Sequence, residues 1–317
     1  MDPDGDGDPS DGIDGWRLDV TNEVPVGFWA DWNAYVRELN PNAYTVTELW
    51  QDASEMIVQG GFSATMNYYA FAFPVKAFLI DFGLEAPEFA RLLDERRNRY
   101  PVAVQYAMQN LIDSHDTDRL ASMIVNRDPA DVHREQFGYD RDNSPRHNPD
   151  YDVQAPDATD RAIQRLVALF QMTYVGAPMI YYGTEAGMWG ADDPDDRKPM
   201  VWPELTYADE ASDPLGRPRR PDPVRFDSTL FRFYRQAIAL RKQSAALRRG
   251  TFEVLVADGG LFVFRRALAD EQVLVALNRE ENAREVALSL PEAERFQVRL
   301  ATVSEAMPSP PQPIRFA

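Results

Sequence analysis

The sequence contains no cysteine and only three histidines. The absence of cysteine excludes disulfides, thiolate metal sites and cysteine nucleophiles, although it does not identify a cellular compartment. No apolar run is long enough to span a bilayer. A nucleotide-binding glycine motif, a zinc motif, a nucleophile elbow and internal repeats are also missing. Any chemistry must therefore use other side chains.

Basic residues are scarce, with 33 Lys and Arg against 51 Asp and Glu, so the formal net charge is −18. This charge repels nucleic acids and anionic membranes, and we expect neither as a partner. A neutral substrate fits the charge better than a phosphate-rich one. The 317 residues are 44% hydrophobic, which suffices for a buried core in one large domain or two medium ones.

The first residues form an acidic cluster. Its spacing matches the first half of a calcium loop, with candidate ligands Asp2, Asp4, Asp6 and Asp8. The match fails at the twelfth position, where Ile13 stands instead of a bidentate glutamate. A calcium-binding turn and a solvated acidic loop therefore both remain open. A strand that ends at a candidate functional carboxylate, Asp19, follows this cluster almost at once. We therefore expect that the beginning of the chain is missing.

The next 240 or so residues alternate between short strands and helices, which is typical of an α/β fold. Strands are predicted at residues 13–18, 44–47, 62–67 and 178–183, with a further apolar pair at 111–112. Helices are predicted at 28–39, 88–99, 162–175 and 230–247. The segments 126–156 and 189–226 lack periodicity and are expected to be long loops.

After residue 249 the pattern changes to short strands, predicted at 252–256, 261–264, 273–277 and 286–290. The sequence Asp258-Gly259-Gly260 is a typical hairpin turn. We therefore predict two domains. Residues 1–248 form the α/β part, and residues 249–317 form a small all-β sandwich.

Three carboxylates follow predicted strands: Asp19, Glu48 and Asp116. If the strands are parallel, their carboxyl ends meet on one rim, where such folds carry their active sites. Arg17 shares a strand face with Asp19, so we expect it to lower the pKa of that carboxyl. Carboxylates in different environments, without cysteine or a histidine cluster, suit glycoside hydrolysis.

Three stretches in this order resemble signature regions of the α-amylase family, glycoside hydrolase family 13. They are Gly12-Ile13-Asp14-Gly15-Trp16-Arg17-Leu18-Asp19, Thr47-Glu48-Leu49-Trp50 and Asn110-Leu111-Ile112-Asp113-Ser114-His115-Asp116. Asn22-Glu23-Val24, Pro178 to Gly183 and Asp195 to Trp202 resemble the neopullulanase, cyclomaltodextrinase and α-glucosidase branch. The resemblance covers nearly the whole chain.

The resemblance implies a role for each residue. Asp19 is the implied nucleophile, Glu48 the general acid/base and Asp116 the stabiliser of the transition state. Arg17 and His115 would bind the reacting glucose unit, while Glu23 and Trp50 would lie nearer the leaving group. The implied reaction is retaining hydrolysis of α-1,4 or α-1,6 bonds in starch-type glucans, maltodextrins, pullulan or cyclodextrins, without an organic cofactor.

The resemblance also implies a partial TIM (β/α)8 barrel, from about strand four to strand eight, followed by the β-sandwich domain. Since strands one to three are not found, we expect the chain alone to be unstable and to have little activity. Two alternatives stay open: a transglycosylase or isomerase of the same family, and a noncatalytic sugar-binding relative. A homodimer, the exact substrate and the compartment are left open as well.

Overall fold

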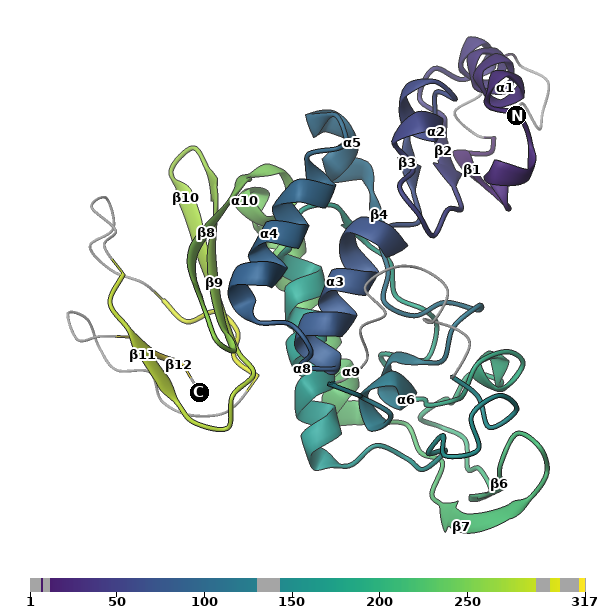
Figure 1. Ribbon diagram of the computed structural model, residues 1–317, viewed down its shortest axis with the longest axis vertical. Helices are drawn as coiled ribbons and strands as arrows, with labels where there is room; N and C mark the ends of the chain where they lie inside the picture. Colours follow the sequence, from purple (N-terminus) through teal and green to yellow (C-terminus); the bar gives the residue numbers. More distant parts are fainter. Residues whose placement is uncertain (1–6, 8–11, 130–142, 289–296, 303–313, 317) are drawn as a thin grey trace.

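The computed structural model describes residue 7 and residues 12–129, 143–288, 297–302 and 314–316. Figure 1 shows short parallel strands on one side, a central group of helices, and an antiparallel sheet on the other side. None of the described helices combines the length and the apolar character needed to cross a membrane. The predicted combination of an α/β part with a carboxyl-terminal sheet is thus confirmed at this coarse level.

Five short parallel strands carry the amino-terminal part: β1 (Gly15–Leu18), β2 (Tyr44–Thr47), β3 (Ala64–Thr65), β4 (Gln109–Asn110) and β5 (Ala177–Pro178). They lie in chain order, because β2 pairs with both β1 and β3, and β4 pairs with β5. A bridge between Met66 and Gln109 joins the two groups. A side chain at Gly15 would collide with the carbonyl of Tyr44, so glycine permits the close approach of β1 and β2.

Helices fill the connections between these strands. They are α1 (Val26–Leu39), α2 (Ser54–Val58), α3 (Phe73–Val75), α4 (Ala86–Arg97), α5 (Val102–Ala107), α6 (Leu120–Val125) and α8 (Ala158–Thr173). Two helices follow β5: α9 (Ser228–Gln243) and α10 (Ala245–Arg249). Asp157 begins α8 with a reciprocal capping box to Asp160, which satisfies otherwise unpaired backbone groups.

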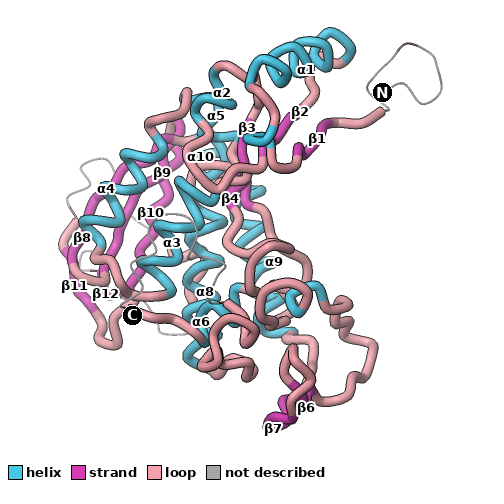
Figure 2. The backbone as a smooth tube through the Cα atoms, turned by 45° about the vertical axis from the view of Figure 1, so that its right-hand side comes forward, coloured by secondary structure: helices cyan, strands magenta, loops and turns pink. Residues whose placement is uncertain are grey.

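The hydrophobic core extends from α1, β2 and α2 to the antiparallel sheet, and Figure 2 shows α4 beside that sheet. Phe170 of α8 stacks on Phe71 with ring centroids 5.8 Å apart, and it also contacts Phe89 of α4. Phe262 and Phe264 of β9 contact the same ring edge to face. The sheet therefore shares one hydrophobic core with the helices.

The antiparallel sheet has the order β10-β9-β8 and contains β8 (Thr251–Asp258), β9 (Leu261–Leu268) and β10 (Glu271–Asn278). Gly259 takes a φ of 56° in the predicted hairpin turn, which confirms that turn. Two further pairs are separate from this sheet: β11 (Arg284–Val286) with β12 (Ile314–Phe316), and β6 (Glu210–Ser212) with β7 (Pro218–Asp222). The closed sandwich remains a prediction.

Several sequence-based boundaries are wrong: the strand 62–67 is only the short β3, the loop 189–226 contains the hairpin β6–β7, and two further cases have a clear cause. The predicted strand 178–183 is only the short β5, because the chain turns at Tyr181 and Gly183, where φ is 83°. The predicted helix 230–247 is two helices, since Ser244 is extended and its hydroxyl caps α10 by accepting the Leu247 N–H at 3.1 Å. Helical periodicity alone does not register such a break.

Candidate active site

The three predicted carboxylates come from three different connections. Asp19 directly follows β1, and Glu48 directly follows β2, as the sequence predicts. Asp116 is different, because β4 ends at Asn110 and Asp116 lies on the loop beyond it rather than at the strand end. Parallel pairing in chain order nevertheless brings all three connections to the same edge of the sheet.

Arg17 is the centre of the cluster. Its guanidinium forms a short ion pair with Asp19, and its Nη2 lies 3.1 Å from Glu48 Oε1 and 4.0 Å from Asp116 Oδ2. The hydrogen bond and charge of Arg17 lower the pKa of Asp19, which is the expected direction. A lowered pKa keeps Asp19 ionised and available as a nucleophile.

Glu48 is held more tightly than Asp19. Its side chain is 7% exposed, against 71% for Asp19. The backbone N–H of Val20 donates to Glu48 Oε2 at 3.0 Å. Val20 has a φ of 38°, an unfavourable conformation for a β-branched residue, and this turns its amide toward Glu48. Strained backbone next to Asp19 therefore fixes the direction of the second carboxylate.

Asp116 has two further neighbours besides Arg17. His115 Nε2 lies 3.3 Å from its Oδ2, and Arg197 Nη2 lies 3.5 Å from its Oδ1. Ser114 Oγ accepts the N–H of Asp116 at 3.1 Å and the hydroxyl of Tyr68 at 2.8 Å. The side chain of Asp116 is thus in contact with His115 and Arg197, and its backbone is held by Ser114.

Trp50 lies beside the cluster and stacks on Tyr68, with ring centroids 4.1 Å apart and an angle of 7° between the planes. Burial raises the pKa of Tyr68, so its hydroxyl stays a hydrogen-bond donor. The predicted residue Glu23 is placed differently, since it ends a short 3-10 helix and is exposed. No contact is described between Glu23 and the three carboxylates.

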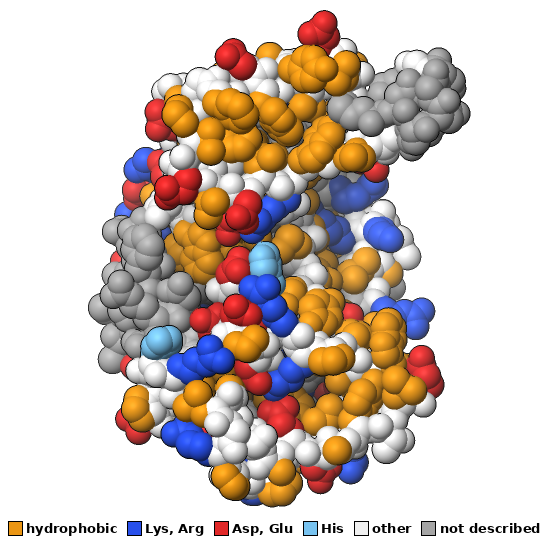
Figure 3. Space-filling model, turned by 90° about the vertical axis from the view of Figure 1, so that its right-hand side faces the viewer, with side chains coloured by type: hydrophobic (Ala, Val, Ile, Leu, Met, Phe, Trp, Pro, Cys, Tyr) orange, Lys and Arg blue, Asp and Glu red, His pale blue; other side chains and the backbone are white. Residues whose placement is uncertain are grey.

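Figure 3 shows the face that contains these connections. Acidic, basic and histidine side chains gather in its middle, below an apolar area over α1 and α2. Exposed apolar residues of this region include Phe28, Tyr35 and Val58. Among the residues that the structure describes, no group of three acidic or histidine side chains could hold a metal ion. The predicted calcium ligands Asp2, Asp4, Asp6 and Asp8 lie outside the described residues.

Sequence reasoning missed Arg197 and Tyr68 as site residues. Arg197 is 81 positions away from Asp116 in the chain, so no local pattern connects them. The available signal was its place in the stretch Asp195 to Trp202, which resembles the family. Tyr68 lies among several aromatic residues and its ring is buried, so no local pattern separates it from the core.

The chain is similar to known proteins over most of its length. The family described as Alpha-amylase C-terminal domain matches residues 250–305. Neopullulanase 2 of Thermoactinomyces vulgaris is 35% identical over 89% of this chain and 40% of its own length. A cyclomaltodextrinase of Geobacillus thermopakistaniensis is 33% identical over 92% of this chain and 41% of its length. The chain therefore spans about two fifths of these relatives.

A solved structure, the debranching enzyme of Nostoc punctiforme soaked with acarbose, matches with a TM-score of 0.66. It is 28% identical, and the match covers 89% of this chain and 51% of that one. The fold, with parallel strands joined by helices, is similar to that of this enzyme. This chain belongs to the α-amylase family, glycoside hydrolase family 13, and to its neopullulanase and cyclomaltodextrinase branch.

Proposed function

We propose that the protein is a retaining glycoside hydrolase that cleaves α-glucosidic bonds of starch-type glucans. One observation carries the proposal: a single guanidinium, that of Arg17, contacts carboxylates from three separate connections. Two carboxyl groups that share one cation are held close together. Retaining enzymes need a separation of about 5 Å, whereas inverting enzymes need a wider gap for a water molecule.

In the proposed reaction, Asp19 attacks the anomeric carbon while Glu48 gives a proton to the leaving oxygen. The glycosidic bond breaks, and a glucosyl ester forms on Asp19. Glu48 then removes a proton from water, which hydrolyses the ester and regenerates both carboxyl groups. Asp116 stabilises the positive charge that develops on the sugar ring. In this proposal His115 binds the reacting glucose unit, and Trp50 lies nearer the leaving group.

The five parallel strands fit the proposed assignment to strands four to eight of a (β/α)8 barrel. Among the described residues, β1 pairs only with β2 and β5 only with β4. Exposed apolar side chains, including Ile13 and Val20, lie beside β1. This open edge supports the expectation of low activity and poor solubility for the chain alone.

The proposal is tested by incubating the 317-residue chain with maltotriose, pullulan and cyclodextrin. We expect slow hydrolysis that is lost in Asp19→Asn and Glu48→Gln and retained in Asp14→Asn, an exposed control one residue before β1. Acarbose, the compound soaked into the Nostoc structure, is expected to inhibit it. Proton NMR should show the α-anomer as the first product. A β-anomer, or activity that survives Asp19→Asn, would overturn the mechanism.

Transfer to another sugar uses the same carboxylates and is distinguished by its products. Incubation with maltose and a sugar acceptor would give new oligosaccharides if transfer prevails. Release of glucose alone supports hydrolysis.

A further inference from the structure

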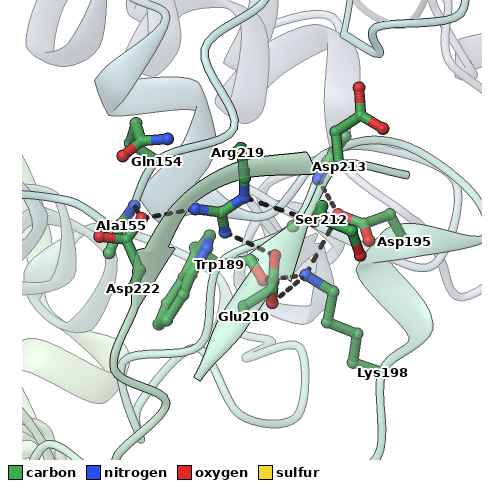
Figure 4. A network of polar contacts seen from close by, with 12 residues as sticks. Gln154, Ala155, Trp189, Asp195, Lys198, Glu210, Ser212, Asp213, Arg219 and Asp222 are labelled. Carbon is green, nitrogen blue, oxygen red and sulfur yellow. Dashed lines mark hydrogen bonds and ion pairs between the residues drawn. The ribbon is translucent and has the colours of Figure 1, made fainter. Parts of the chain in front are cut away.

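A row of charged side chains links the hairpin β6–β7 to the loop before it (Figure 4). Arg219 contacts Glu210 Oε1 at 2.9 Å and Asp222 Oδ2 at 2.7 Å. Lys198 Nζ lies 2.9 Å from Glu210 Oε2 and 3.2 Å from Asp195 Oδ2. Glu210 is therefore the carboxylate that the two cations share, with one oxygen on each.

These charges are largely removed from water. The side chain of Arg219 is 7% exposed, that of Glu210 20% and that of Lys198 25%. Partly buried ions require partners, and loss of one leaves the others incompletely compensated. Burial raises the pKa of Asp195, which makes it the weaker anion for Lys198. Glu210 is therefore the stronger of the two anionic partners of Lys198, whose Nζ also donates to the Trp189 carbonyl at 3.5 Å.

Lys198 is the direct chain neighbour of Arg197, whose Nη2 lies 3.5 Å from Asp116 Oδ1. The side chain of Arg197 is 43% exposed, so ion pairs rather than packing hold it, and its Nε lies 2.8 Å from Asp193 Oδ1 in the same loop. The backbone is held on both sides of Arg197: the Asp196 carbonyl accepts from Arg119 Nε at 2.7 Å, and the Lys198 carbonyl accepts the Tyr182 hydroxyl at 2.6 Å. A shift of Lys198 would therefore move Arg197 away from Asp116.

We propose that Glu210 is a positioning residue for the active site. By holding Lys198, it fixes the loop that presents Arg197 to Asp116. Glu210 contacts Lys198 and Arg219, and the hairpin β6–β7 thereby acts on the site through the loop. The inference rests on the proposed function, in which Asp116 faces the reacting sugar.

The first test is a double-mutant cycle on the full chain, with kcat/KM for maltotriose as the measurement. Glu210→Gln keeps the size of the side chain and removes its charge, and we expect a loss of about tenfold to about a hundredfold. The same change in an Arg197→Gln background should cost little more, because both act on one contact. Independent, multiplying losses would overturn the proposal. The matched control is Glu253→Gln, which breaks an exposed ion pair with Arg265 and should change nothing.

A structural readout does not depend on activity. In crystals of Glu210→Gln the contact between Arg197 and Asp116 should be lost, and in Glu253→Gln it should persist. If Glu210→Gln does not fold, Lys198→Gln removes the same link at a more exposed position and should have the same effect. An unchanged contact in the variant refutes the positioning role. If instead the wild type hydrolyses no glucan while the contact still depends on Glu210, the proposed function fails and the positioning role stands.

Discussion

Replacing Asp118 by asparagine should change how the stability of the protein depends on pH. Asp118 lies two residues after Asp116 on the same loop, is 1% exposed, and accepts the Tyr151 hydroxyl at 2.8 Å. Burial raises its pKa from the ordinary 3.8 to about 8, although Tyr151 and Lys76 oppose the shift. The folded protein therefore keeps a proton on Asp118 at neutral pH.

The magnitude follows from this pKa. Between pH 3.8 and about 8 the unfolded chain releases a proton that the folded chain keeps. Stability must then fall as the pH rises, by about 1.4 kcal/mol for each pH unit. From pH 5 to pH 7 the loss due to this one group is about 2.7 kcal/mol. Asparagine cannot ionise, so Asp118→Asn removes this part of the pH dependence.

Urea unfolding followed by tryptophan fluorescence measures the effect at both pH values. The compared quantity is the change in the free energy of unfolding between pH 5 and pH 7. Any pH-independent effect of the substitution on stability therefore cancels. Other buried acids, such as Asp196 with a pKa of about 7, are present in both proteins and cancel as well. Asp270→Asn, in an exposed turn, serves as the control and should follow the wild type. Parallel stability changes in wild type and Asp118→Asn would refute the reasoning.

Three further predictions concern the site, the core and the metal. Arg17→Met removes the cation shared by the carboxylates and should lower kcat/KM for maltotriose at least about a hundredfold. The acidic limb of its pH–rate profile should move to higher pH, because Arg17 lowers the pKa of Asp19 in the wild type. An acidic limb at the wild-type position would contradict this. Phe170→Ala removes the ring at the centre of the core and should lower the free energy of unfolding in urea by about 3 to 5 kcal/mol. A loss below about 1 kcal/mol would mean that this cluster is not the core. Calcium added to chelator-treated protein should raise the Tm of the wild type but not that of a variant in which asparagine replaces the predicted ligands Asp2, Asp4, Asp6 and Asp8. An equal rise in Tm in both proteins would refute that site.

Local patterns predicted some elements well. The strand 44–47 and the end of the helix at Leu39 agree with β2 and α1, because alternation and helical spacing are decided within a few residues. The position of Asp116 was less accurate, since β4 is short and the loop after it is held by side-chain contacts. Such contacts join distant segments, as Tyr68 and Ser114 do.

The candidate site shows the same division. Arg17 and Asp19 are two residues apart on one strand, so their ion pair could be predicted from the sequence. The contact of the strained Val20 could not be predicted, because its amide donates to Glu48, which lies 28 positions further along the chain. The contacts of Glu210 and Arg197 could not be predicted either, because both residues lie in a segment without periodicity. Sequence reasoning identifies the reactive groups better than it identifies what holds them.

The most direct test of the mechanism is to trap the glucosyl ester. An activated fluoroglucosyl fluoride forms the ester and slows its hydrolysis, so even a weakly active chain accumulates it. Mass spectrometry of the digested protein should find one fluoroglucosyl group on the peptide with Asp19, and none in Asp19→Asn. A label on a different residue, or hydrolysis of glucan without a label on Asp19, would contradict the assignment of Asp19 as the nucleophile.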